Sequence, residues 1–319
     1  MLNCTLDREN VGYLNSIIKE KNKLSILNNF QTKNFSKDNM NGLDEVGLVD
    51  ISGNIVETIK PVIDILANPY AVIKMVFTGG AGSYEHNISY DNSFQKHVSF
   101  TVTPENVTID DESNPKSIIK VLEDFVGVSK LKSLNISKKF NKAEGLVVAS
   151  MLDMERKLIL RAFVDEIPFT HNSYNTNMAW RIINSTSANI QWFVHNINEV
   201  IGEHIPLSQQ QVQDAINQLI TKGDITNHGG MYQLSGELSM LANRMIIVDN
   251  ILNVHASKQN EQGEIIGSGF TCIQSGVHDL LLLDYNGSEI IFNTVSSNKL
   301  FDYLDQFLNC EMYFSKMRA

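Results

Sequence analysis

The sequence predicts an α+β fold with two pseudo-twofold-related halves, each an antiparallel sheet with flanking helices and a winged-helix-like N-terminal portion. One observation is an internal repeat: residues 47–68 and 223–243 each begin with Gly, contain a Gly turn and end in Leu-Ala-Asn. A second is that helical and strand periodicities follow both copies in the same order. We therefore predict an N-terminal half at 1–128, a helical middle segment at 129–206 and a C-terminal half at 207–319.

In the first half, apolar spacing predicts a helix over Leu6–Glu20, and the polar stretch Lys21–Asn41 is expected to be loop. A hairpin turns at Ser52-Gly53-Asn54 and leads into a helix over Thr58–Leu66, with Pro61 in its first turn. Alternating and β-branched runs then predict four strands, and an amphipathic helix follows: Ala71–Thr78, Tyr84–Tyr90, His97–Thr103, Val107–Asp110 and Pro115–Gly127.

The middle segment carries two long helical patterns, over Met151–Glu166 and Asn177–Glu203. The second half then repeats the order of the first. Ser208 is the predicted N-cap of a helix that extends to about Lys222. A hairpin, a short helix, four strands and a closing helix follow: Ile225–Leu234, Ser235–Leu241, Met245–Ala256, Ile265–Ser275, His278–Tyr285, Glu289–Thr294 and Lys299–Phe307.

Composition limits the classes of function. The chain has 319 residues, of which 43% are apolar and 19% charged, and its formal net charge is −10. That charge argues against nucleic acid as the main partner, since such proteins need a basic face. The lysine-rich stretch Ser129–Lys142 is interpreted as a solvated linker.

The three scattered cysteines, Cys4, Cys272 and Cys310, form neither a disulfide framework nor a metal-binding Cys-x-x-Cys pattern, which favours a reducing compartment. No signal peptide is evident at the N-terminus. The longest apolar run, Leu280–Leu283, is too short to span a bilayer. We expect a cytoplasmic protein without membrane insertion.

Candidate catalytic motifs are weak. The Gly-rich stretch Thr78–Ser83 lacks the Gly-Lys-Ser/Thr that opens a helix in phosphate-binding loops, so it is interpreted as a hairpin turn. His195, Glu199 and Glu203 are spaced to share one helix face beside His204, but a solvated polar stripe is favoured over a metal site. We predict no catalytic residue, no metal and no cofactor, and we do not expect an enzyme.

Four aromatic-ring side chains gather in the stretch Gly79–Phe94: Tyr84, His86, Tyr90 and Phe94. If this stretch forms an exposed, Gly- and Asn-rich hairpin tip, these rings are suitable anchors for a protein partner. We therefore predict them as partner-binding residues. The alternative is that they fold back onto the sheet.

The duplicated half and the order of its elements resemble the EspG family, the cytosolic chaperones that bind substrates of type VII secretion systems. The resemblance covers most of the chain and is architectural. It implies a pseudo-twofold α+β fold that binds helical-hairpin substrates through its sheet and a strand–strand loop. Transferred by position, that loop is Gly79–Phe94.

The predicted function is therefore that of a cytosolic chaperone or adaptor that binds a helical secreted protein. A winged-helix regulator is an alternative, but it needs a basic recognition helix. Ser208–Lys222 has a single Lys and a single Asp, and Leu43–Leu48 has no basic residue. An immunity protein or an enzyme with a site between the halves is a third possibility, and it predicts clustered titratable residues.

Overall fold

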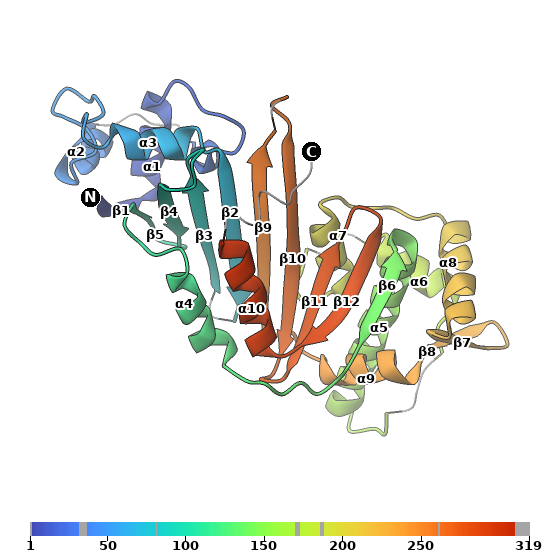
Figure 1. Cartoon of the computed structure of the whole chain (residues 1–319). Coiled ribbons are helices and arrows are strands. Elements are labelled where there is room, and N and C mark those ends of the chain that lie inside the picture. Colours follow the sequence, from blue (N-terminus) through green and yellow to red (C-terminus); the bar gives the residue numbers. More distant parts are fainter. Residues whose placement is uncertain are drawn as a thin grey trace. The chain divides into compact units, whose positions relative to one another are not determined.

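A computed structural model describes residues 2–31, 37–80, 82–169, 173–185, 188–260 and 262–309 (Figure 1). Two compact units make up the chain. Unit 1 consists of Met1–Phe125, Asn253–Ser268 and Phe301–Ala319, and unit 2 consists of Val126–Leu252 and Gly269–Leu300. Four elements contain residues of both units: α4 (Ser117–Val126), β9 (Asn250–Gln259), β10 (Ile265–Ser275) and α10 (Ser297–Leu308).

Unit 1 is built on antiparallel strands whose order is β1-β5-β4-β3-β2. Their bounds are β1 (Asn3–Asp7), β2 (Ala71–Gly79), β3 (Gly82–Tyr90), β4 (His97–Val102) and β5 (Asn106–Asp110). On β5 the side chains of Val107 and Ile109 are buried while their neighbours are not, the alternation expected of a sheet with one covered face.

The buried face of this sheet is covered by helices of the N-terminal region. These are α1 (Arg8–Ile17), the 3₁₀ turn η1 (Ile26–Asn29), α2 (Lys37–Glu45) and α3 (Lys60–Ala67). Asp7 caps α1 by accepting a hydrogen bond from the Asn10 backbone N–H at 2.7 Å. α4 (Ser117–Val126) follows β5, and the Phe125 ring contacts Phe77 of β2 with centroids 5.2 Å apart.

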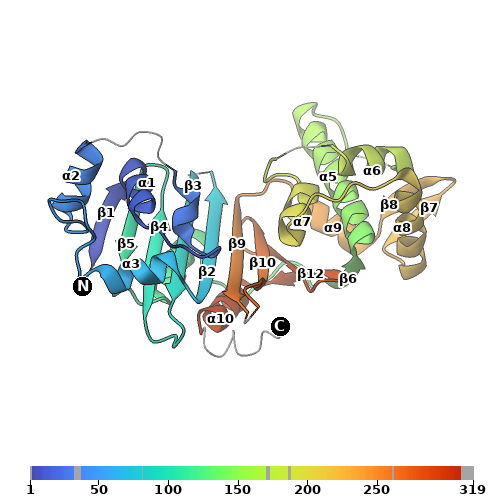
Figure 2. The same cartoon turned by 90° about the horizontal axis from the view of Figure 1, so that it is seen from above.

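In unit 2 the antiparallel strand order is β10-β11-β12-β6, with β11 (Asp279–Tyr285), β12 (Glu289–Val295) and β6 (Ser137–Asn141). A separate hairpin joins β7 (Ile225–His228) to β8 (Met231–Leu234). Helices cover one face of the four strands (Figure 2). They are α5 (Lys142–Val164), α6 (Thr176–Ile183), α7 (Phe193–Ile201), α8 (Gln209–Lys222) and α9 (Gly236–Arg244).

The α+β class and the repeated order of elements are confirmed. Helix, turn or hairpin, helix, four antiparallel strands and helix occur in 37–126 and again in 209–308. The predicted cap is present as well, because the Ser208 hydroxyl accepts the Gln211 N–H at 3.2 Å in a reciprocal capping box. The pseudo-twofold relation and the three-domain boundaries stay predictions.

The linker interpretation of Ser129–Lys142 was wrong. Residues Ser137–Asn141 form β6, which pairs with β12, and Phe140 is buried against Phe292 with centroids 5.2 Å apart. β6 carries two adjacent lysines, Lys138 and Lys139, before its one apolar residue, Phe140. Lysine is common on strands that lie at a sheet edge, as β6 does. The strand was missed in the sequence because the stretch is rich in lysine and β6 contains only one buried apolar residue, Phe140.

Other predicted boundaries need correction. The N-terminal helix begins at Arg8, because residues 3–7 pair with β5. The polar stretch 21–41 contains η1 and the start of α2, and β9 begins at Asn250 rather than at residue 245. The long pattern 177–203 is two helices, since α6 ends at Ile183 and α7 begins at Phe193. Within the described ranges, no helix combines the length and apolar character needed to cross a membrane.

Candidate functional site

The predicted aromatic site lies mostly on a strand. Tyr84, His86 and Tyr90 belong to β3, and Phe94 lies in the turn between β3 and β4 with φ +57°. The stretch Gly79–Phe94 is thus not the exposed loop that the sequence suggested, because β3 pairs with β2 and β4 along its length. Whether these side chains bind a partner stays a prediction.

The four side chains form two groups. Tyr84 stacks on His86 with centroids 6.4 Å apart, while Phe94 contacts Tyr90 at 6.0 Å and Tyr70 at 5.5 Å. Six residues separate Tyr84 from Tyr90, which is about 20 Å along an extended strand. His86 and Tyr90 are buried, whereas Tyr84 and Phe94 are half-buried. The two half-buried rings are therefore not parts of one continuous anchor.

His86 lies in an environment that disfavours charge. Its Nδ1 is 2.8 Å from the Thr101 hydroxyl on β4, and burial lowers its pKa to about 4. The imidazole is therefore neutral at physiological pH.

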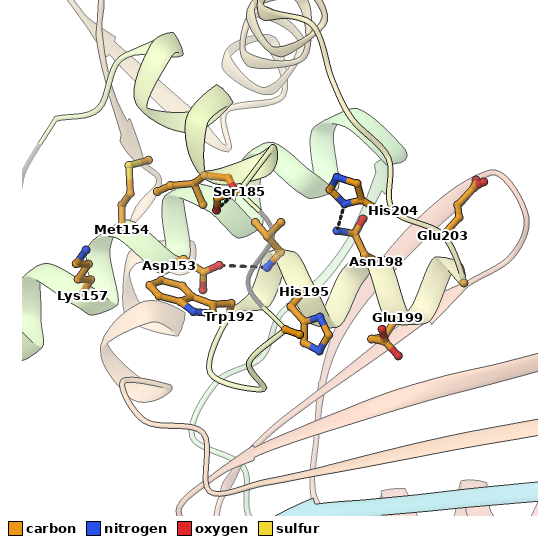
Figure 3. Close-up of a pocket in the computed structure, with 14 residues that line it drawn as sticks. Asp153, Met154, Lys157, Ser185, Trp192, His195, Asn198, Glu199, Glu203 and His204 are labelled. Carbon is orange, nitrogen blue, oxygen red and sulfur yellow. Dashed lines mark hydrogen bonds between the residues drawn. The ribbon is translucent and has the colours of Figure 1, made fainter. Parts of the chain in front are cut away.

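Unit 2 contains a pocket with a volume of about 630 Å³. It lies between α5, the end of α6 and α7, and Figure 3 shows its side chains. Apolar groups form most of its surface, and polar groups surround the opening. The lining residues are Asp153, Met154, Lys157, Ile182, Ser185, Ala188, Trp192, Val194, His195, Asn198, Glu199, Gly202, Glu203 and His204.

The α7 wall of the pocket is fixed by a carboxylate from α5. Trp192 precedes α7 without a side-chain cap of its own. Instead, Asp153 accepts hydrogen bonds from the backbone N–H groups of Phe193 at 2.9 Å and Val194 at 3.1 Å. A carboxylate at a helix N-terminus satisfies orphan donors and stabilises the positive end of the helix dipole.

Arg156 completes this buried network. Its guanidinium pairs with Asp153 at 3.1 Å and lies over the Phe193 ring, 4.8 Å from the centroid. It also donates to the backbone carbonyls of Gln191, Met245 and Ile246. The guanidinium therefore has hydrogen-bond partners and an ion-pair partner in place of water, which a buried charge needs to be stable. The network holds α5, α7 and the segment before β9 in one arrangement.

Burial raises the pKa of Asp153 to about 7, while the Phe193 N–H, Arg156 and the Val194 N–H act in the opposite direction. Both carboxylate oxygens are already engaged by α7, so we assign Asp153 to positioning the wall rather than to chemistry.

The rim of the pocket carries charges of both signs. Glu203 pairs with Lys142 at 3.0 Å, and Asn198 contacts His204 at 3.3 Å. Lys157 on α5 and Glu199 on α7 are exposed and form no ion pair within the described part of the chain. The stripe of His195, Glu199 and Glu203 seen in the sequence therefore borders the pocket. No group of three metal-ligating side chains that could hold an ion occurs among the described residues.

Sequence reasoning identified the polar stripe of α7 but missed the pocket beside it. Its apolar walls come from separate elements: Met154 on α5, Ile182 on α6, and Val194 on α7. A usable signal was present in α5, whose apolar residues are not confined to one face. Ile159 is buried, while Leu160, Phe163 and Val164 are exposed. An amphipathic helix that packs on one side shows a single apolar stripe, so the second stripe indicates a second contact surface.

Comparison with known proteins gives a limited result. No protein-family model matches the chain, and no curated protein matches its sequence. Among solved structures, it is similar to the Mycobacterium tuberculosis type VII secretion system chaperone EspG5, solved in complex with a PE25–PPE41 dimer. The identity is 10%, the match covers 94% of this chain and 93% of that chain, and the TM-score is 0.48. A likeness of this size assigns neither partner nor site residues, so function has to be inferred from the chain itself.

Proposed function

We propose that this protein is a non-enzymatic chaperone or adaptor that binds a helical secreted protein in the cytoplasm. The observation that carries the proposal is the pocket of about 630 Å³ between α5, α6 and α7. A cavity of about 150 Å³ already holds a benzene ring. The volume therefore suits several large apolar side chains, or a small molecule in the usual size range for ligand sites.

A helix is the partner element that best fits this pocket. The walls are themselves helices, and a helix that lies between two others presents large apolar side chains three and four residues apart. The wall that Asp153 and Arg156 hold in place needs little reorganisation on binding, which favours affinity. The unpaired rim charges, Lys157 and Glu199, suit a partner with an acidic and a basic residue beside its apolar ones.

The resemblance to the EspG family supports the same reading, since it predicts a type VII-like chaperone from the duplicated order of elements. The formal net charge of −10 is also compatible with a protein partner rather than with nucleic acid.

Co-expression with the small helical secreted proteins of the source organism, followed by purification and calorimetry, tests the proposal. We expect a stoichiometric complex with at least one of them. Ala188→Trp places an indole in the pocket and should weaken that complex at least tenfold. Thr221→Trp, on the exposed surface of α8, is the matched control and should change the affinity less than twofold. Absence of any complex, or equal affinities for wild type and Ala188→Trp, would refute the proposal.

The intrinsic fluorescence of the pocket provides a second readout. Trp192 lines the pocket, whereas Trp180 donates its indole N–H to the Leu207 carbonyl at 2.9 Å. Entry of apolar partner side chains around Trp192 should shift its fluorescence emission to shorter wavelength. The spectrum of Ala188→Trp alone is subtracted from its spectrum with the partner, and this difference should show no such shift.

Tyr84 is proposed as an additional contact. It is half-buried, while His86 beneath the same stack is buried. We therefore expect Tyr84→Ala to weaken the complex directly. His86→Ala should act on the stability of unit 1 instead, measured by circular dichroism. If Tyr84→Ala binds the partner with unchanged affinity, Tyr84 on β3 is not part of the binding surface.

A further inference from the structure

A second apolar surface lies at the C-terminal end of α5. Leu160, Phe163, Val164 and Ile167 expose 37%, 70%, 80% and 56% of their accessible area, whereas Ile159 and Ala162 are buried. Leu160, Phe163 and Val164 follow the i, i+3, i+4 spacing of one helix face, and Ile167 comes directly after the C-terminal turn of α5. We name these four residues the α5 ridge. Contiguous exposed apolar side chains of this kind mark interaction sites in soluble proteins.

The ridge is presented by ordered backbone. α5 ends in a Schellman arrangement, in which the Ile167 N–H donates to the Ala162 carbonyl at 3.1 Å and the Glu166 N–H donates to the Phe163 carbonyl at 3.4 Å. Glu166 takes the left-handed conformation that this motif requires, with φ +52°. Because the end of the helix is closed in this way, Ile167 is held next to the last turn.

The charges beside the ridge identify its partner. Lys157 precedes the ridge and Glu166 interrupts its far end, and both are exposed without an ion pair among the described residues. The other two charges of this segment, Arg161 and Asp165, pair with each other at 3.1 Å. The ridge is therefore positive at one end and negative at the other, which makes it complementary to itself in the antiparallel direction.

We propose that the α5 ridge joins two copies of this chain in an antiparallel, twofold-symmetric dimer. An axis at the level of Ala162 places Leu160 of one copy opposite Val164 of the second copy, with the two Phe163 rings beside the axis. Lys157 lies about 7–8 Å to one side of that level, at 1.5 Å rise per residue, and Glu166 lies just past the helix end on the other side, so each lysine meets the glutamate of the other copy. A parallel arrangement would place lysine against lysine.

The contact is isologous and therefore closes on itself. With only four apolar side chains from each copy, the contact is small for a specific interface, which usually buries about 1,200–2,000 Å². We therefore expect a reversible dimer with a dissociation constant on the order of micromolar. The inference goes beyond the proposed function, because it needs no partner protein and is tested on the isolated chain.

Sedimentation equilibrium of the full chain between about 1 and 100 μM measures the association. The average mass of the wild type should rise from one chain toward two across this range. Phe163→Asp should remain a monomer throughout. Lys157→Glu and Glu166→Lys should each weaken the dimer at least tenfold, because each sets like charges against one another twice. The double variant K157E/E166K exchanges the two charges and should return to within about threefold of the wild type.

Lys139→Glu on β6 makes the same charge change at an exposed position before the other end of α5, about twenty residues from the α5 ridge in sequence. It should leave the association unchanged. Tryptophan emission and circular dichroism confirm that each variant is folded. A wild type that stays monomeric at 100 μM, a dimer that survives Phe163→Asp, or a double variant as weak as the single ones would each overturn the proposal. Recovery of dimerisation in K157E/E166K would show that the two charges pair across the interface, because a general change of surface charge would not restore association.

Discussion

Gly145 provides a quantitative test of the packing in unit 2. It is buried in the first turn of α5, where it faces Ile290 of β12. A Cβ built on Gly145 would lie 2.7 Å from the Ile290 Cδ1, but 3.5 Å from its Cβ and 3.6 Å from its Cγ1. A single methyl group therefore accounts for the whole conflict, and Val at position 290 lacks that methyl.

The free energies follow from this geometry. Gly145→Ala gains about 1 kcal/mol of helix propensity and loses about 1–3 kcal/mol through overpacking, a net destabilisation of about 1 kcal/mol. Ile290→Val alone should cost about 0.5–1.5 kcal/mol. In the double variant the alanine methyl occupies the space that the isoleucine methyl vacated. We expect stability within about 0.5 kcal/mol of wild type, and a favourable coupling energy of about 2 kcal/mol.

Urea unfolding monitored by tryptophan emission measures these values. The sequence has two tryptophans, Trp180 and Trp192, and both belong to unit 2. The signal therefore reports the unit that contains Gly145 and Ile290. Additive effects within about 0.3 kcal/mol would refute the reasoning, because residues in contact should couple and independent ones should not.

Three further predictions concern strain, titration and reactivity. Glu166→Gly should stabilise dilute protein by about 1 kcal/mol in the same urea assay, since glycine adopts φ +52° without a Cβ penalty; a loss of stability would contradict this. Burial lowers the pKa of His86 to about 4, below its value in the unfolded chain. The free energy of unfolding should therefore be highest above about pH 6.5 and fall by up to about 3 kcal/mol as the pH drops to about 4. His86→Gln should flatten this pH dependence, measured by circular dichroism during unfolding. Burial raises the pKa of Cys4 to about 11 and that of Cys272 to about 12, so both should resist a thiol-specific reagent at pH 8 until urea unfolds the chain.

Features that depend on near neighbours in the sequence were predictable. The Ser208 cap, the Pro61 position in the first turn of α3 and the turn at Gly53 with φ +79° all depend on a few consecutive residues. The alternation of β5 also locates its own buried face. These elements were identified correctly because local chemistry and tertiary packing favour the same conformation there.

Features set by distant neighbours were not predictable. β6 is a strand because Ile290 and Phe292 of β12 supply the partner for its backbone, a partner about 150 residues away in sequence. The rings of β3 looked suitable for an exposed tip, but their exposure depends on β2 and β4 on either side. Likewise, Asp153 caps a helix that begins forty residues later, so no local pattern reveals its role.

The internal repeat and the candidate surfaces occupy different parts of the chain. The repeated order of elements runs through 37–126 and 209–308, with Leu66 of α3 and Leu241 of α9 both buried at the corresponding point. The pocket residues fall between 153 and 204, and the α5 ridge between 160 and 167. A duplicated element must satisfy the same packing in both copies, which leaves it little freedom to acquire one specific site. The helices between the copies have no counterpart, so α5 can cover a sheet with one face and present a binding surface with the other.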